Sequence, residues 1–499
     1  MKKQFFYAAM ALAMLSSCSK DNDPGVVPNP DEGNNDDKVA IELGVSNPSV
    51  TVNTRGFGSV GDVEGDKNHW SSQRLFIYMI DKTTGLEAED PAGTKILDND
   101  PTNGLEFRAP ADKNSGDIRI YTHGSYNTTT GQDDKGTIQY KYYPATGTYK
   151  FYGYHIDDAT ADAVTISADA TTKATTMSLN NIEINGTQDI LGAATIALPE
   201  TQNTTETDKP YYIKDAIADW AKLVSNYQFS ARTARAKIKP ILKFQHQLAR
   251  LQFYVRAGND AAAGYTYNTT SSTWEERKTT DATAANLGMQ VTRVTLKDMV
   301  SKINMNLTNV DATALVEKPA STKVDGTTAP FYIHQKNASG ELEVEMNAAD
   351  ANAPTNNNLK TVVCPKYPWA DANKPTLDTD IDAVKGTPVG EPVLFFPNGD
   401  INFTIDLKQY LIQTEDEITG DKTYDWKSNS SDLKLYEKAI ATASTTDGSL
   451  KFEPGKSYNV YLTIYGFERI EISAELTAWE EGGDINTDIE DNTEPQPAP

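Results

Sequence analysis

The sequence predicts an all-β protein with long loops, and three features support that fold class. Short apolar runs that alternate with polar residues recur over the 499 residues, whereas apolar stripes with helical spacing are scarce. Thr, Asn, Asp and Gly separate the runs, and these residue types favour turns. One or two short helices are expected, the best candidate being 211–228, where four apolar side chains fall on one face. A chain of this length can form two or three domains, each with its own core.

The charge and the cysteines exclude several partners and bonds. Acidic residues outnumber basic ones 70 to 46, which gives a net charge of −24, and such a field repels nucleic acid. Of the two cysteines, Cys18 belongs to the N-terminal segment described next, so no structural disulfide is expected. Cys364 lies in a Val-rich strand candidate and is interpreted as a small buried hydrophobic residue.

Residues 1–17 have the layout of a secretion signal, with two lysines, a short apolar run and then small residues. The run ends in Leu15-Ser-Ser-Cys18, which resembles the lipobox of bacterial lipoproteins. That resemblance implies that Cys18 becomes the first residue and carries several acyl chains, which anchor a protein stably in a membrane. The alternative is an ordinary signal peptide with an incidental cysteine. Residues 18–38 are polar, resemble an acidic export tag at their start, and are predicted to form a disordered tether.

Residues 39–55 are predicted to form an N-terminal strand followed by a loop. Apolar residues alternate with others over Val39–Val52, with a break at Pro48. The loop places Arg55 and Gly56 among small residues, and exposed loops of this kind are where proteases cut. The segment 39–55 therefore ends at a candidate site of proteolysis.

Two domains and a tail are predicted after this segment. Residues 56–237 and 238–479 each contain a series of strand candidates, and a basic stretch around Lys237 marks the boundary. The tail, 480–499, has seven acidic residues and no basic one. It is predicted to be disordered, or ordered only on a partner.

The last strand candidate has the most regular pattern of the chain. Alternation over Ile470–Ala478 predicts a strand with one apolar face, and Pro454-Gly455 and Gly466 supply the turns around a hairpin. Two interpretations remain open, because this strand either closes a sandwich of its own chain or completes the sheet of a neighbouring molecule. The side chains of the candidate donor strand are Ile470, Ile472, Ala474, Leu476, Ala478 and Trp479.

No catalytic, cofactor-binding or metal-binding pattern is found in the sequence. The five histidines never lie two to four residues apart, and no phosphate-loop, Gly-x-Ser-x-Gly or His-Glu-x-x-His motif is present. His246, in an alternating strand, is interpreted as a satisfied core or half-buried side chain. The loop pairs Asp133-Asp134 and Asp157-Asp158 are interpreted as solvated turns, with bound calcium as the open alternative. The chain is not expected to be an enzyme.

Several stretches together resemble the fimbrillin family, the type V pilin subunits of Gram-negative anaerobes. The matching segments are the lipobox at Cys18, Tyr149–Tyr154, Thr187–Leu191, Phe244–Leu251, Pro454–Ile464 and Ile472–Trp479. The resemblance implies two transthyretin-like β-sandwich domains. It also implies that an arginine-specific protease cuts after Arg55 and removes the strand within Val39–Val52. The groove left behind would accept the C-terminal strand of another subunit.

The resulting hypothesis is a structural or adhesive pilus subunit, exported as an outer-membrane lipoprotein and exposed at the cell surface. Its partners would be other pilin subunits, the outer membrane through the lipid on Cys18, and a glycan or protein on a host or bacterial surface. One alternative is a monomeric glycan-binding lipoprotein that uses Trp274 and Trp369 as stacking platforms. The other is an anchor or tip subunit of the pilus.

Overall fold

The structure, a computed structural model, describes residues 38–45, 70, 72–81, 95–97, 105–109, 116–122, 124, 126–127, 132–133, 139–168, 175–196, 229–235, 239–259, 262, 265–268, 273–276, 288–311, 316–334, 362–363, 386–415, 422–436, 440–441 and 451–477. The chain divides after Val39 into two units. All strands described below belong to the second unit, Ala40–Pro499.

The first sheet has eight strands and contains both the first and the most buried strands of the N-terminal half. Its order is β1-β12-β11-β8-β2-β4-β5, with β3 also pairing with β2. The bounds in that order are β1 Gly44–Val45, β12 Ile241–His246, β11 Leu191–Ile196, β8 Tyr149–His155, β2 Arg74–Asp81, β4 Leu105–Arg108 and β5 Arg119–Thr122, with β3 at Lys95–Leu97.

Both faces of this sheet are buried at β2 and β8, which is why these strands are apolar at nearly every position. On one face the ring of Trp70 packs edge-on against Phe244, with centroids 4.9 Å apart. On the other face Tyr78 and Tyr152 belong to the large core cluster that continues into the C-terminal half.

A four-stranded sheet packs against β11. Its strands, in order across the sheet, are β20 (Ala320–Lys323), β17 (Lys302–Asn306), β10 (Thr175–Glu183) and β9 (Thr165–Ala168). A side chain at Gly192 would bring its Cβ to 2.7 Å from Pro319 Cβ and 2.8 Å from Met305 Sδ. The close approach of the two layers therefore requires glycine at position 192.

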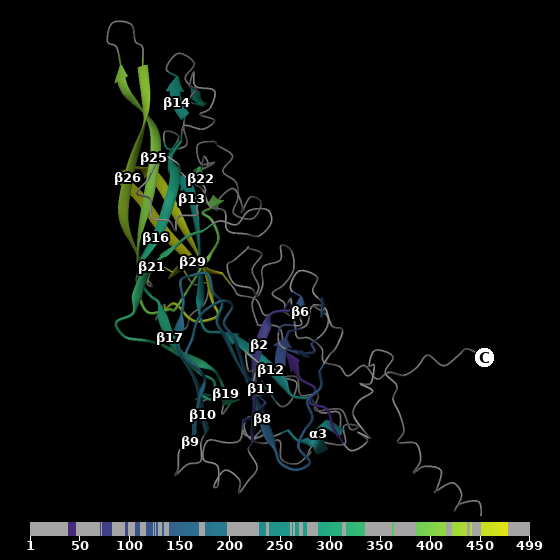
Figure 1. Ribbon diagram of the computed structural model, residues 1–499. Coiled ribbons are helices and arrows are strands. Elements are labelled where there is room, and N and C mark those ends of the chain that lie inside the picture. The colour runs from purple at the N-terminus through teal and green to yellow at the C-terminus, as the bar shows by residue number, and fades with distance from the viewer. Residues whose placement is uncertain are drawn as a thin grey trace, which may run out of the picture. The chain divides into compact units, whose positions relative to one another are not determined.

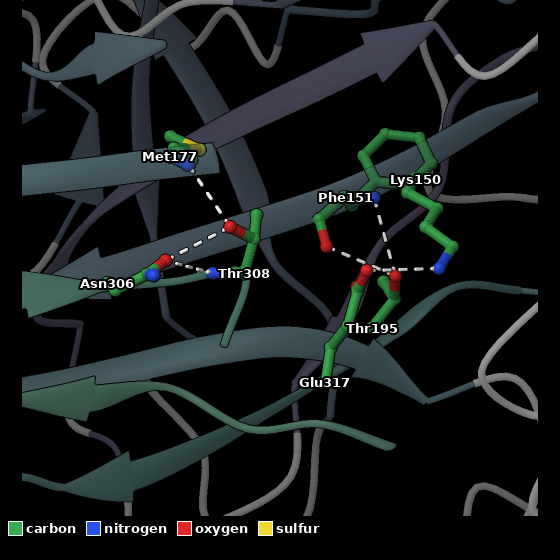
Figure 2. Close-up of polar contacts among 7 residues, drawn as sticks. All are labelled: Lys150, Phe151, Met177, Thr195, Asn306, Thr308 and Glu317. Carbon is green, nitrogen blue, oxygen red and sulfur yellow. Dashed lines mark hydrogen bonds and ion pairs between the residues drawn. The ribbon is translucent and has the colours of Figure 1, made fainter. Parts of the chain in front are cut away.

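Two groups of polar contacts lie near these sheets (Figure 2). Lys150 Nζ on β8 lies 3.2 Å from Glu317 Oε1 on β19 (Val316–Glu317), a short strand that pairs with β18 (Val310–Asp311). The Thr308 hydroxyl accepts from the Met177 amide at 3.1 Å and donates to Asn306 Oδ1 at 3.0 Å. These bonds fix the connection between β17 and β18 against β10.

The C-terminal half forms a sandwich of two further sheets. One has the order β23-β13-β28-β29-β27, with β24 on β13, and the other has the order β21-β16-β25-β26, with β22 on β16. Phe253 of β13 and Phe403 of β25 join the two layers, with ring centroids 5.2 Å apart. The strands of the first sheet are β23 (Thr387–Pro388), β13 (Ala249–Ala257), β28 (Ser457–Gly466), β29 (Arg469–Thr477), β27 (Ile440–Ala441) and β24 (Val393–Phe395). The strands of the second sheet are β21 (Thr328–Tyr332), β16 (Gln290–Val300), β25 (Ile401–Glu415), β26 (Lys422–Leu435) and β22 (Val362–Val363).

The remaining described elements are short. Two hairpins pair β6 (Tyr126–Asn127) with β7 (Gln132–Asp133) and β14 (Tyr265–Asn268) with β15 (Thr273–Glu276). The one described α-helix, α3, spans Ala231–Arg235. Ser230 caps it, since the Thr233 amide donates to the Ser230 hydroxyl at 3.3 Å. Figure 1 shows the long β25–β26 pair in green beside β16.

The predicted all-β, sandwich-like fold with long loops is confirmed. The helix predicted over 211–228 lies outside the described residues. The division into 56–237 and 238–479 stays a prediction, although strands from both sides of it share sheets: β12 joins β11, and β17 joins β10. Among the described helical residues, none forms a segment long and apolar enough to cross a membrane.

Candidate functional site

The segment 40–45 lies as an extended strand between two parts of the chain that are distant in sequence. On one side β1 runs parallel to β12, with Gly44 opposite Ile241, and the Gly44 amide donates to the Pro240 carbonyl at 2.8 Å. On the other side residues 116–118 run antiparallel to it. The bonds on that side are Val45 N to Gly116 O at 2.7 Å and Ile118 N to Leu43 O at 2.9 Å; nearer the start, Ile41 N donates to Lys141 O at 2.7 Å. We call the surroundings of this segment the strand seat.

Three apolar side chains hold the segment in the strand seat. Ile41, Leu43 and Val45 are 4%, 2% and 0% exposed, whereas Glu42 between them faces solvent. Burial of each stabilises the docked strand by about 1.5–3 kcal/mol, roughly 5–9 kcal/mol in total before the cost of ordering the segment. Without the segment, the Ile241–Leu242 edge of β12 and residues 116–118 would have unpaired backbone groups beside an apolar trough.

The candidate donor strand is the closing strand of its own chain in this structure. β29 pairs with β28 along its whole length, from Gly466 opposite Arg469 to Ser457 opposite Thr477. Ile470 and Ile472 are half-buried and pack against the core. Ala474 and Leu476 stand opposite Val460 and Tyr458 in the register, and β27 pairs with β29 on its other side at Ala474 and Glu475. Donation of this strand to another molecule stays a prediction.

Exposed charged side chains pair on the solvent face of β29. Arg469 Nη2 donates to Glu471 Oε1 at 2.6 Å, and the Tyr465 hydroxyl donates to Glu471 Oε2 at 2.9 Å. These two hydrogen bonds lower the pKa of the Glu471 carboxyl, the bond from Arg469 contributing most. Because the group is exposed, water and salt weaken the pair.

A buried polar network connects β2, β8 and β12 through two of the sequence segments on which the fimbrillin resemblance rests. Asp189 accepts from His246 Nδ1 at 2.9 Å, and its own amide donates to Asp157 Oδ2 at 2.7 Å. His155 lies 2.8 Å from Asp157 Oδ1 through Nε2 and 2.8 Å from the Arg74 carbonyl oxygen through Nδ1. The backbone φ of Asp157 is 44°, a left-handed conformation that Asp tolerates.

The two partners of His155 determine its protonation. A carboxylate and a carbonyl oxygen only accept hydrogen bonds, so both partners are satisfied when the ring is protonated, and they favour the imidazolium. Burial lowers the pKa of His155. The hydrogen bond to Asp157, the charge of Asp157, the Arg74 carbonyl and the charge of Asp189 together outweigh burial and raise the pKa above its ordinary value of 6.5.

The network is suited to fixing strands in place. It ties the end of β8 to the start of β2 and, through Asp189, to the end of β12, the strand whose other end borders the strand seat. Among the described residues, no group of three or more His, Cys, Asp or Glu side chains is arranged to hold a metal ion. Asp157, one of the carboxylates considered for calcium, is bonded within this network instead. His246 is 7% exposed and hydrogen-bonded, as its strand position predicted.

Several predicted site residues lie outside the described part of the chain. These are the lipidation residue Cys18, the cleavage residues Arg55 and Gly56, and the last two donor residues, Ala478 and Trp479. Trp369 and Cys364 lie outside it as well, while Trp274 pairs with Tyr267 in the β14–β15 hairpin.

Sequence reasoning missed the residues that form the strand seat. Asp117, Lys141 and Pro240 come from separate regions, and nothing in their local sequence marks them as neighbours of residues 40–45. The available signal was Gly44, a glycine inside an otherwise alternating apolar run, because such a glycine often marks the close approach of another group.

Comparisons with known proteins give matches among solved structures only. No model of a protein family matches the sequence, and no curated protein is similar to it. A candidate cell adhesion protein from Bacteroides uniformis shares 11% identity at a TM-score of 0.35, over 89% of this chain and 99% of that one. The tip fimbrial protein Mfa3 from Porphyromonas gingivalis, truncated at its C-terminus, shares 9% identity at 0.26, over 88% and 100%.

The fimbrial anchor protein Mfa2 from the same organism shares 10% identity at a TM-score of 0.22, over 88% of this chain and 99% of that one. All three TM-scores are low, and the fold of this chain is defined by its own strand pairing and core.

Proposed function

We propose that this protein is a pilus subunit that reaches the outer membrane as a lipoprotein and assembles by exchange of a β-strand after proteolysis. The observation that supports this most is the strand seat. An N-terminal segment of six residues, 40–45, fills a groove with three buried apolar side chains, and the candidate cleavage loop at Arg55 follows it in sequence.

Cleavage after Arg55 would change how the segment is held. In the uncut chain β1 is tethered to β2 through the residues between them, so a strand that leaves the seat returns quickly. Once the chain is cut, only the hydrogen bonds and the buried side chains of residues 40–45 retain the strand. Dissociation then exposes the edge of β12 and the apolar trough, a surface that pairs readily with another strand.

The vacated seat would receive the C-terminal strand of another subunit, with Ile470, Ile472 and Ala474 as its apolar side. Such a strand restores the main-chain hydrogen bonds and fills the alternate pockets. In an isolated chain β29 is satisfied by β28, so donation occurs only where a vacated seat offers equivalent pairing. A contact of this head-to-tail kind does not close on itself and therefore propagates a filament.

The chain would reach its place of assembly through Cys18. Acyl chains on this residue hold the precursor at the outer membrane, with the polar residues 18–38 as the tether. Its proposed partners are then other pilin subunits and the membrane, and an adhesive role adds a glycan or protein ligand on another surface. Cleavage after Arg55 would release the rest of the chain from this anchor.

The test is proteolysis of the purified precursor with an arginine-specific protease. We expect trimming to a chain that starts at Gly56, followed by polymers visible by size-exclusion chromatography and electron microscopy. The variant Arg55→Ala should stay uncut and monomeric. Arg235→Ala, which changes an exposed arginine of α3, is the matched control and should behave as the unmodified chain. Equal trimming and polymerisation of Arg55→Ala would rule out the proposed mechanism.

The intact mass of the protein extracted from cells separates a stalk from an anchor. A chain that starts at Gly56 indicates a processed subunit that can take part in the pilus stalk. A chain that still carries an acylated Cys18 indicates an uncleaved anchor subunit.

A further inference from the structure

A side-chain bridge crosses the outer face of the strand seat. Lys239 precedes Pro240, which accepts the Gly44 hydrogen bond, and Asp117 follows Gly116, which accepts the Val45 hydrogen bond. The Lys239 ammonium forms an ion pair with the Asp117 carboxylate. Because these two residues belong to the two walls of the seat, their side chains reach each other over the strand between them. We call this ion pair the Lys239–Asp117 strap.

The strap passes over Gly44. A Cβ at that position would point to the outer face, where it would lie 3.6 Å from Lys239 Cε, 3.4 Å from Ile241 Cγ1 and 3.5 Å from the Gly116 oxygen. These are ordinary van der Waals distances, so a methyl group fits beneath the strap. A bulkier side chain, such as that of leucine, would meet Lys239 and have to displace it. With the strap closed, Gly44 is buried although Glu42, on the same face, is exposed.

We infer that the strap selects the strand that occupies the seat, by requiring a small residue between the second and third buried apolar positions. This inference rests on the proposed function for the exchange itself. The required pattern is an apolar residue, an exposed residue, an apolar residue, a small residue and an apolar residue, as in Ile41-Glu-Leu-Gly-Val45.

One segment of the candidate donor strand has this pattern. Residues 470–474 read Ile-Glu-Ile-Ser-Ala, against Ile-Glu-Leu-Gly-Val for 41–45. In this alignment Ser473 takes the place of Gly44, and its Cβ fits beneath the strap. The occupant is therefore the segment 470–474 of a second copy of this chain, entering in the same direction as β1.

The alignment also explains why the donor strand can replace the N-terminal strand in the strand seat. Ala474 is smaller than Val45 and fills less of its pocket, which weakens binding of the donor strand. Beyond this point, however, the N-terminal strand has Asn47 and then Pro48, which cannot donate a ladder hydrogen bond, whereas the donor continues with Leu476 and Ala478. The donor thus has a longer uninterrupted apolar face than the strand it replaces.

The first experiment tests the strap in the uncut full-length chain. Hydrogen exchange of residues 40–45 should be nearly unchanged in Gly44→Ala and about ten- to hundredfold faster in Gly44→Leu, because overpacking weakens the docked strand. Removing the strap with Lys239→Ala should abolish most of the difference between the two substitutions. Equal exchange in Gly44→Ala and Gly44→Leu, or a Leu effect that Lys239→Ala leaves intact, would overturn the inference.

The second experiment tests the occupant on the chain cut after Arg55. Labelled peptides spanning 468–478 compete with the retained N-terminal fragment, one with Ser473 and one with Ser473→Leu. The Ser peptide should displace the fragment at about ten- to hundredfold lower concentration than the Leu peptide, and this preference should vanish in Lys239→Ala. Equal potency of the two peptides would refute selection by the strap. If neither peptide binds, the proposed exchange with this donor is wrong, while the first experiment still decides the strap in the uncut chain.

Discussion

The N-terminal strand β1 and the C-terminal strand β29 each have one apolar face, yet they are attached in opposite ways. β1 pairs with β12 over two residues, and the segment 40–45 makes its other backbone hydrogen bonds with residues 116–118 and 141. β29 is one arm of a hairpin whose ladder runs from Ser457 opposite Thr477 to Gly466 opposite Arg469. A tight turn keeps β29 beside its partner, whereas β1 depends on walls brought together by the rest of the fold.

This difference separates local from global stability. β28 contributes fully buried side chains to the main core, so the proposed donation of β29 would uncover part of the C-terminal sandwich. The strand seat has its own small set of buried residues, so we expect a chain cut in the loop that follows β1, at Arg55, to lose β1 while the sheets persist. The four predictions that follow test this separation.

The largest effect is expected for Leu462→Ala in β28, opposite Ile472. Leu462 is 0% exposed, and truncation of such a side chain costs about 2–5 kcal/mol of the free energy of unfolding. Urea denaturation measures it, with the exposed Glu468→Ala as a control that should change little. A small effect of Leu462→Ala would mean that the closing hairpin is not part of the cooperative core.

A local effect is expected for Leu43→Ala in the strand seat. On the chain cut after Arg55, loss of this buried side chain should weaken retention of the N-terminal fragment by about 2–3 kcal/mol, or about 30- to 150-fold in its dissociation rate. Size-exclusion chromatography with mass detection follows the release. Glu42→Ala, the exposed neighbour, should leave the rate unchanged; the same acceleration in both variants would contradict retention by buried apolar contacts.

A smaller effect that depends on pH is expected from His155. Its pKa is raised in the folded chain, so its stabilising contribution is complete below its ordinary value of 6.5 and is lost as pH rises through the raised pKa. Unfolding by urea from about pH 6 to pH 9 measures this loss. His155→Gln should cost about 1–2 kcal/mol at the acid end and flatten that part of the profile. An unchanged slope in the variant would assign the pH dependence to another group.

The smallest effect is expected for Glu471→Gln on the solvent face of β29. The carboxylate pairs with Arg469 in full contact with water, so its removal should not measurably change urea denaturation. At pH values low enough to protonate carboxylates, the unmodified chain should then behave as the variant does. A clear loss of stability in Glu471→Gln would show that the β29 edge depends on its outer charges as well as its apolar side.

The sequence was sufficient where the pattern is local. Strict alternation around Ile470 and Ile472 predicted β29, because a period of two is a property of one strand. The segment before Arg55 was also predicted as extended from its own alternation. The Asp189 and His246 segments stood out as motifs, although their bond to each other could not be read from either one.

The pairing between distant segments could not be predicted from the sequence. Nothing in the residues around Asp117 or Lys239 shows that they lie on either side of Gly44, because that contact depends on how three loops return the chain to one edge. For the same reason the sequence did not show that β12, which lies at the start of the predicted second domain, pairs with β11 in the first sheet. Hydrophobic periodicity reports which face is buried, not which strand lies next to it.

The wide sequence separation between β1 and its walls has a consequence for the order of folding. Residues 40–45 can dock only after residues 116–118, 141–142 and 239–242 have already come together, so β1 joins in one of the last steps. Contacts formed that late are absent from the transition state and mainly slow unfolding. Release of the N-terminal strand after a cut is then the reversal of a late folding step, and the structure left behind resembles the form that the chain passes through just before it is complete.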